Sequence, residues 1–191
     1  MTLLPSLYLP PISWFAAFKS GEPIAIEVNE NFQKQTLRNR CHIDSPNGRL
    51  PLSIPIDKSN FDSNGKCLMR DVRISRQLDW QHQHWFAFET SYCKSPFFEY
   101  LQDDFRPIYE REWTYLIDLN DALTQICLDL LEIDTRPQPT HTFAGMPPRF
   151  PASGTTTREY YQVYKHKHGF LPDLSIFDLI MNMGPEAILY L

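Results

Sequence analysis

A cluster of basic residues between positions 33 and 49 is the pattern in this sequence best suited to binding chemistry. The segment holds four cations and one carboxylate: Lys34, Arg38, Arg40, Arg49 and Asp44. Its local net charge is therefore +3, in a protein whose formal net charge is −5. Guanidinium groups bind phosphate or carboxylate through paired hydrogen bonds, so the segment predicts a site for a small anionic ligand, either a sugar nucleotide or a sugar phosphate. The alternative is a solvated strand whose charges point into water.

The spacing of these residues indicates which side chains can act together. An extended segment places Lys34, Arg38 and Arg40 on one face and Gln33 and Asn39 on the other. We therefore take both sets as candidate ligand-binding residues: Gln33, Lys34, Arg38, Asn39 and Arg40.

The start of the chain adds a second candidate binding element. Leu7–Leu9 predicts a strand that prolines close, and an apolar helical pattern over residues 12–18 leads to a second predicted strand, Ile24–Val28. This order favours a parallel pair with the helix start at the carboxyl edge of the sheet, where open α/β folds bind nucleotides. Pro11 and Trp14, at the start of that helix, therefore join the candidate ligand-binding residues.

Three residues are candidates for catalysis. Cys41 has cationic neighbours in the sequence, and a thiolate close to cations is a nucleophile; a buried packing cysteine is the alternative. His84 is a candidate acid or base, with a core histidine as the alternative. Asp71, at the start of a predicted short strand over Asp71–Ser75, is a candidate catalytic carboxylate.

Composition narrows the class of protein and of ligand. The 191 residues include 16 Pro and 7 Gly, which argues against a glycine-rich phosphate loop. The negative net charge argues against a nucleic-acid partner. The four cysteines lack the CxxC spacing of zinc sites, and no apolar run reaches the length of a membrane span. We therefore expect a small-molecule partner, no metal site and a cytoplasmic location. The sequence does not indicate whether the protein uses a cofactor or which oligomeric state it adopts.

Short strands and a helix are expected up to the middle of the chain. Phe32–Asp44 and Leu50–Ile56 predict a hairpin with a longer loop around the turn Pro46–Gly48. Apolar residues at helical spacing after Asp79 predict a helix, with a strand over Trp85–Thr90 as the alternative.

The second half of the chain is expected to be mainly helical. Ser95–Pro96 predicts the start of a helix that ends before Pro107. Asp118 predicts the cap of a long helix with an apolar stripe. Asp173–Met183 predicts a final amphipathic helix, followed by a last strand or a docked tail at Ala187–Leu191.

Together these elements predict an α/β fold with residues 1–191 forming a single domain. The parallel strand–helix–strand start belongs to a mixed sheet from the N-terminal half, and helices from the C-terminal half pack on it. Arg136–Thr157 contains five prolines and predicts a long loop or lid over the site.

Several stretches of the chain form a recognisable set of motifs. They are YLPPISWF at Tyr8–Phe15, NENFQKQTLRNRC at Asn29–Cys41, PNG at Pro46–Gly48, LSIPI at Leu52–Ile56, SPFFEY at Ser95–Tyr100, DLN at Asp118–Asn120 and NMGPE at Asn182–Glu186. In these motifs the sequence resembles the WbqC-like protein family over nearly its whole length. The most specific part of the resemblance is the segment around Gln33, Arg38, Asn39 and Arg40.

The resemblance implies a bacterial protein associated with O-antigen and other surface-polysaccharide gene clusters, and it supplies no agreed set of catalytic residues. Two functions from different classes therefore stay open. The first is a cytoplasmic transferase that acts on a nucleotide-activated amino sugar in polysaccharide biosynthesis. The second is a non-catalytic ligand-binding or scaffold protein within a glycan-assembly complex.

Overall fold

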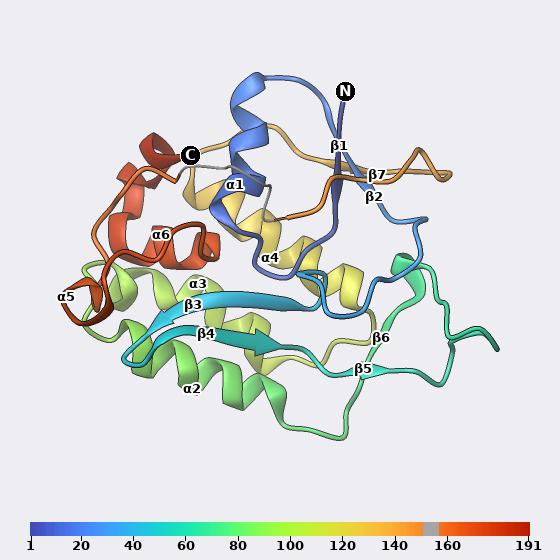
Figure 1. The fold of residues 1–191 in the computed structure, drawn as a ribbon, viewed down its shortest axis with the longest axis horizontal. Coiled ribbons are helices and arrows are strands. Elements are labelled where there is room, and N and C mark those ends of the chain that lie inside the picture. The colour runs from blue at the N-terminus through green and yellow to red at the C-terminus, as the bar shows by residue number, and fades with distance from the viewer. Residues whose placement is uncertain (151–156) are drawn as a thin grey trace.

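A three-stranded parallel sheet is formed near the N-terminus in the computed structural model, which describes residues 1–150 and 157–191. Its strands are β1 (Thr2–Pro5), β2 (Ile24–Glu27) and β7 (Gln138–Pro139), in the order β1-β2-β7 (Figure 1). The first two are connected by α1 (Ile12–Phe15) and a 3-10 helix, η1 (Ala16–Ser20). The predicted strand–helix–strand start and the α/β class are thus confirmed.

The first strand lies earlier than predicted. Leu7–Leu9 is not a strand, because Leu9 has a φ angle of 40°, in the left-handed region that an extended chain excludes. All three residues of this apolar run are instead buried in the core. As a result, Ser6 and Leu7 directly follow the carboxyl end of β1.

A tight hairpin of β3 (Arg40–Ser45) and β4 (Gly48–Ser53) crosses the middle of the molecule. The pair nearest the turn is Ser45 with Gly48, so the loop has two residues and the predicted longer loop is wrong. The strand also begins later than predicted, because residues 33–38 form turns. Lys34 and Arg38 therefore do not share a strand face with Arg40.

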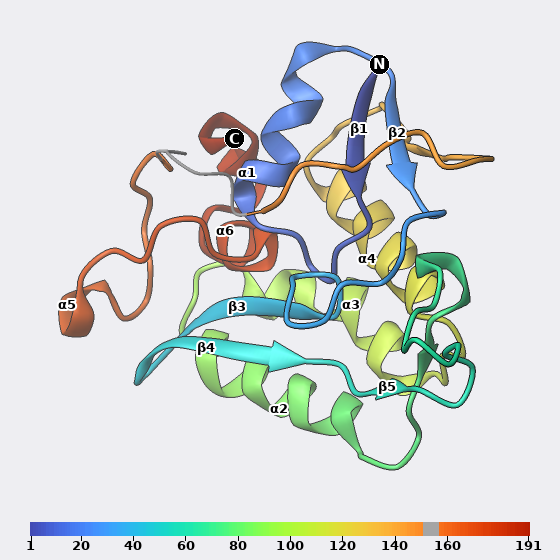
Figure 2. The ribbon, with the colours of Figure 1, turned by 45° about the vertical axis from the view of Figure 1, so that its right-hand side comes forward.

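The two faces of β3 have different surroundings. Cys41 and Ile43 are buried in the core, so Arg40 and His42 project from the opposite face. Both views place the hairpin beside α2 (Figures 1 and 2), and β3 contacts both α2 and α6.

Short elements connect the hairpin to the helices. β5 (Ile56–Asp57) pairs antiparallel with β6 (Arg73–Ile74), which is shorter than the predicted strand there. A 3-10 turn, η2 (Met69–Asp71), precedes β6.

Two helices follow, α2 (Trp80–Tyr92) and α3 (Phe98–Glu110). The helical prediction for α2 is confirmed. The predicted start of α3 at Ser95 is wrong, because the Ser95 hydroxyl donates to the Tyr92 carbonyl at 2.9 Å and completes the preceding helix. The predicted end before Pro107 is also wrong: Pro107 lies on the exposed side of α3, where water can satisfy the carbonyl that its ring leaves unbonded.

The long helix α4 (Leu116–Leu130) begins two residues before the predicted cap, with Asp118 in its first turn. The final helix α6 (Ile176–Met183) is confirmed, and its cap is Ser175, which accepts from the Phe177 amide. The tail after it is a 3-10 helix, η3 (Gly184–Tyr190), so the alternative of a last strand is wrong.

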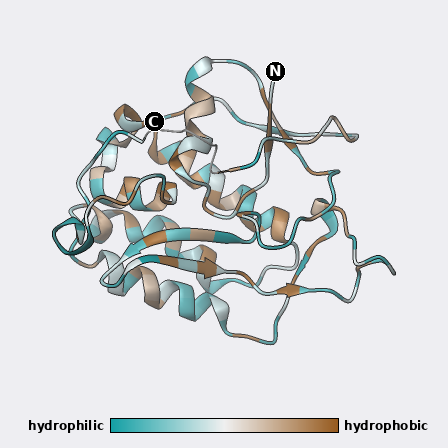
Figure 3. Cartoon of the chain, in the orientation of Figure 1, coloured by the Kyte–Doolittle hydropathy of each residue, from teal (hydrophilic) through white to brown (hydrophobic). Residues whose placement is uncertain are grey.

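The segment predicted as a lid is partly built into the fold. Gln138 and Pro139 form β7, and Thr140 donates its backbone N–H to the Ile26 carbonyl at 2.9 Å. Residues 151–156 of the predicted lid lie outside the described residues. Further on, α5 (Lys165–His168) is a single hydrophilic turn (Figure 3).

The core joins sheet, hairpin and helices in one cluster of buried side chains from Leu4 to Ala187. A carboxylate, Asp178 of α6, is buried within it and accepts hydrogen bonds from the hydroxyls of Tyr92 and Tyr160 at 2.7 and 2.5 Å. Burial raises the pKa of Asp178 to about 6, although these two hydrogen bonds oppose the rise. Within the described ranges, none of the helices is both long enough and apolar enough to span a bilayer.

Candidate functional site

Two adjoining cavities form a groove beside the carboxyl end of β1. The larger has a volume of about 480 Å³ and lies between the turns of residues 33–38, the start of β3 and Pro148–Phe150. The smaller, of about 60 Å³, shares Leu37, Arg40 and His42 with it. We call the pair the basic groove, after five of its side chains: Lys34, Arg40, His42, Arg49 and Arg149.

The charge of the basic groove is strongly one-sided. Among the described residues, the lining of the larger cavity contains no carboxylate, and no acidic side chain forms an ion pair with Lys34, Arg40 or Arg149. The smaller cavity has one acid, Asp173, whose carboxylate accepts from the backbone N–H and the hydroxyl of Ser13 at 2.8 and 2.9 Å. The groove therefore attracts anions in a protein that is negative overall.

The hairpin fixes the central side chains of the groove. The Arg40 Nε atom donates to the Ser53 hydroxyl across the hairpin at 2.8 Å, which leaves the terminal nitrogens of its guanidinium for another partner. The carbonyl of His42 accepts from the Ser175 N–H at 2.8 Å, so the strand is held against the start of α6. On β4, Arg49 donates to the Pro172 carbonyl at 2.5 Å.

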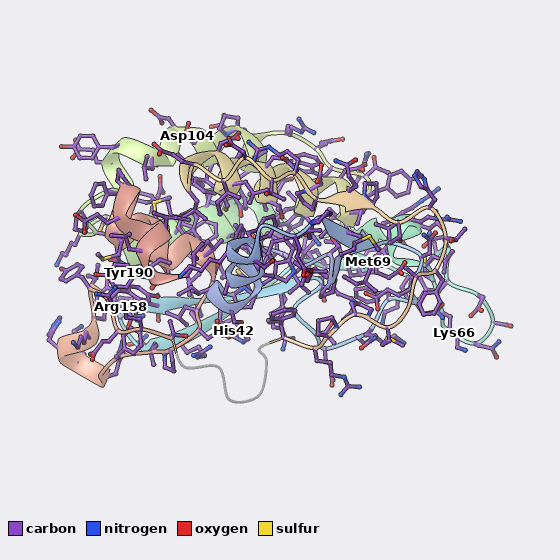
Figure 4. The ribbon with its side chains drawn as sticks, turned by 90° about the horizontal axis from the view of Figure 1, so that it is seen from above. His42, Lys66, Met69, Asp104, Arg158 and Tyr190 are labelled. Atoms are coloured by element: carbon purple, nitrogen blue, oxygen red, sulfur yellow. The ribbon has the colours of Figure 1, made fainter. Side chains whose placement is uncertain are left out.

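His42 is half-buried between two cations, on the side of the molecule opposite Asp104 of α3 (Figure 4). Burial lowers the pKa of its imidazole, and the positive charges of Arg49 and Arg40 lower it further. Because its ordinary pKa is 6.5, a lowered value keeps the ring neutral near pH 7. A neutral imidazole can accept a proton, which is the property of a general base.

Backbone strain is concentrated at the same place. Four described residues other than glycine have a positive φ angle, and three of them line the basic groove: Leu9 at 40°, Gln35 at 59° and Asp173 at 49°. Such conformations cost roughly 1–3 kcal/mol each and are found preferentially at functional sites. The strain supports the groove as the functional site independently of its charge.

Arg38, a predicted ligand-binding residue, borders the larger cavity but is already paired. Its guanidinium donates to both carboxylate oxygens of Glu30 at 2.7 Å, and both side chains are buried. Burial raises the pKa of the Glu30 carboxyl, while Arg38 opposes that rise. The pair therefore holds the turns that carry Gln33 and Lys34, and Arg38 has little charge left for a ligand.

The other predicted ligand-binding residues are divided among several places. Gln33 and Lys34 line the larger cavity of the groove, and Pro11 lines the smaller one. Asn39 instead donates its side-chain amide to the Ile54 carbonyl at 2.8 Å. Trp14 is buried, donates to the Pro5 carbonyl at 3.0 Å and borders a different cavity beside α4.

The three predicted catalytic residues are not brought together. His84 lies in the core, where its Nδ1 atom bonds to the Tyr8 hydroxyl at 2.8 Å and burial lowers its pKa to about 4. The thiol of Cys41 is buried, and burial raises its pKa, which disfavours the thiolate. Asp71 lies at the surface in η2, beside Arg70 at 3.6 Å.

Sequence reasoning missed three contributors to the groove: His42, Arg149 and Phe150. The alternation of strand side chains could have identified His42, which is two residues from Arg40. Arg149 and Phe150 could have been found only from the expectation that the proline-rich segment Arg136–Thr157 covers the site.

Comparison with known proteins agrees with the family resemblance. The model of the WbqC-like protein family matches residues 6–150, a range that contains most of the groove. The chain is 27% identical over 228 positions to "Uncharacterized protein Rv1507c" of Mycobacterium tuberculosis, covering 100% of this chain and 96% of that protein. No solved structure matches the chain. Because the family model covers well over half of its residues, this chain belongs to the WbqC-like protein family.

Proposed function

We propose that the protein binds a phosphate-bearing small molecule, an activated sugar, in the basic groove. One observation carries this proposal: a cavity of about 480 Å³ is lined by several basic side chains and, within the described residues, by no carboxylate. An arginine guanidinium can donate two parallel hydrogen bonds to a phosphate group. The ring of Phe150 adds an apolar surface for a base or a sugar. The volume suits a nucleotide-sized ligand.

The same groove supports group transfer as the reaction, with His42 as the general base. In this proposal His42 takes the proton of the acceptor hydroxyl or amine as that group bonds to the sugar carbon that carries the phosphate. The bond from this carbon to the phosphate oxygen breaks, and Arg40 and Arg149 stabilise the negative charge of the leaving nucleoside diphosphate. The association with surface-polysaccharide gene clusters that the family resemblance implies supports bacterial glycan biosynthesis as the setting and a cytoplasmic transferase as the class. Binding without turnover would instead favour the alternative, a non-catalytic ligand-binding protein.

Removing a cation from the groove is expected to weaken ligand binding. Arg40→Ala and Arg149→Ala should each lower the affinity for UDP-N-acetylglucosamine by about 10- to 100-fold, because a charge-assisted hydrogen bond contributes roughly 1.5–3 kcal/mol. Isothermal titration calorimetry measures the change. Arg106→Ala is the matched control, since Arg106 is exposed on α3 and paired with Glu110. Unchanged affinity in both groove variants would contradict the proposal.

Replacing the proposed base is expected to separate binding from turnover. His42→Gln stays neutral, so it should bind UDP-sugars nearly as wild type does while losing roughly 10²–10⁴-fold in transfer rate.

In wild type, the transfer rate should fall as the pH drops through the pKa of His42, which lies below 6.5, because protonation removes the base. Mass spectrometry of products from nucleotide sugars mixed with amine and hydroxyl acceptors measures both effects. A His42→Gln protein with the wild-type rate would show that His42 is not the base.

A further inference from the structure

A second cavity lies between α4 and the parallel sheet, with a volume of about 470 Å³. It opens where β1 and β2 end, and Leu7 lines both this cavity and the basic groove. Its walls are partly apolar, from Ile26, Val28 and Ile117. We call it the α4 cavity.

A buried hydrogen-bond acceptor borders the α4 cavity. Asn120 is 1% exposed, and its Nδ2 atom donates to the Ser6 hydroxyl and to the Arg38 carbonyl at 3.1 and 3.0 Å. Its Oδ1 atom has no partner within the described part of the chain. A buried acceptor without a donor is destabilising, so a ligand whose O–H or N–H group reaches the Asn120 side chain from the cavity would satisfy it.

The charges at the cavity point to the same kind of ligand. Both arginines that line it are engaged by carboxylates outside the lining: Arg70 lies 3.6 Å from Asp71, and Arg136 forms an ion pair with Asp129. The two acids in the lining, Asp118 and Asp121, are exposed on the first two turns of α4 and form no ion pair among the described residues. The cavity therefore presents hydrogen-bond acceptors and two carboxylates that have no ion-pair partner among the described residues, in contrast to the basic groove.

We infer that the α4 cavity binds a small polyhydroxylated amine of the amino-sugar class. Its ammonium group lies near Asp118 and Asp121, its hydroxyl groups donate to the polar side chains, and its C–H faces pack on the apolar wall. As the acceptor site of a transferase this inference rests on the proposed function, because the basic groove then holds the activated donor on the other side of Leu7. The inference that the α4 cavity binds an amino sugar does not depend on the proposed function.

The test uses glucosamine as the probe with the full-length protein and no nucleotide present. Amide chemical shifts in an NMR titration should move saturably at Ser6, Asn120 and Thr124, which line the cavity. Glucose should bind more weakly because it lacks the ammonium group. The double variant Asp118→Asn/Asp121→Asn should weaken glucosamine binding about fivefold, as expected for two partly exposed charge pairs.

Controls separate this inference from the proposed function. Asp104→Asn, on the exposed face of α3 away from the cavity, should bind glucosamine as wild type does. Arg40→Ala should also leave glucosamine binding unchanged, whatever it does to UDP-sugars. Gln125→Trp, at a half-buried lining position, should block the site without removing a charge. The inference is overturned if glucosamine fails to shift these amides, if glucose binds equally well, or if both cavity variants bind as wild type does.

Discussion

A chain that ends after Phe170 is expected to lose cooperative folding. The removed segment contributes six large apolar side chains that are 0–1% exposed in the core: Leu174, Ile176, Phe177, Leu179, Ile180 and Met181. Each such burial stabilises the fold by roughly 1.5–3 kcal/mol, and whole domains are stable by only about 5–15 kcal/mol. The loss therefore equals or exceeds the free energy of unfolding, as expected if residues 1–191 fold as one domain.

Circular dichroism during thermal unfolding measures this effect. A point variant provides a graded comparison: Phe177→Ala should fold but lose about 3–5 kcal/mol of its free energy of unfolding. The centroid of the Phe177 ring lies 4.4 Å from that of Phe88 and 4.9 Å from that of Phe105, so the truncation leaves a cavity among packed rings. Leu189→Ala, at a 62% exposed position in η3, is the control and should change stability little. A soluble 1–170 fragment that melts cooperatively near the wild-type temperature would show that α6 is an appendage.

Removing the carboxylate of Glu30 is expected to be nearly as damaging. Glu30→Ala leaves the Arg38 guanidinium buried without its partner, and breaking such a pair costs about 3–5 kcal/mol. The exposed pair of Glu22 with the N-terminal amine provides the control, since Glu22→Ala removes a contact between groups that are each more than half exposed. Chemical denaturation with urea measures both changes in the free energy of unfolding.

A double variant tests whether the lost stability comes from the unpaired charge. Glu30→Met/Arg38→Met replaces both partners by apolar side chains and should recover most of the stability that Glu30→Ala loses. It should also keep UDP-sugar binding in the groove if Arg38 acts on structure alone. A double variant as unstable as Glu30→Ala would contradict this account of the pair.

The elements that could be predicted from the sequence are those whose stability is local. The apolar patterns of α4 and α6 each lie within a single helix, and the turn Pro46–Asn47 indicated the hairpin, although not the length of its loop. The end of α3 could not be predicted, because Pro107 is tolerated on the solvent side of a helix whose other face is buried. That tolerance depends on tertiary packing.

In the candidate site, too, local features could be predicted from the sequence and long-range contacts could not. A basic segment indicated an anion site, yet its spacing could not reveal that Arg38 is neutralised by Glu30 while Arg40 is not. His84 was a reasonable catalytic candidate until the fold placed the Tyr8 hydroxyl on its ring, 76 residues away in the chain. Contacts between side chains so far apart in the chain depend on how the whole chain folds, and no local sequence pattern reveals them.

The buried carboxylate of Glu27, at the end of β2, has a consequence for the order of folding. It accepts from the Ala144 N–H at 2.7 Å, across 117 residues, and from the Thr140 hydroxyl at 2.8 Å. While the chain emerges from the ribosome, β1 and β2 can pair early, but Glu27 must stay hydrated until residues 140–144 arrive. The central strand of the sheet is therefore completed late, so an unpaired strand edge is exposed during synthesis, when nascent chains are most prone to associate with one another.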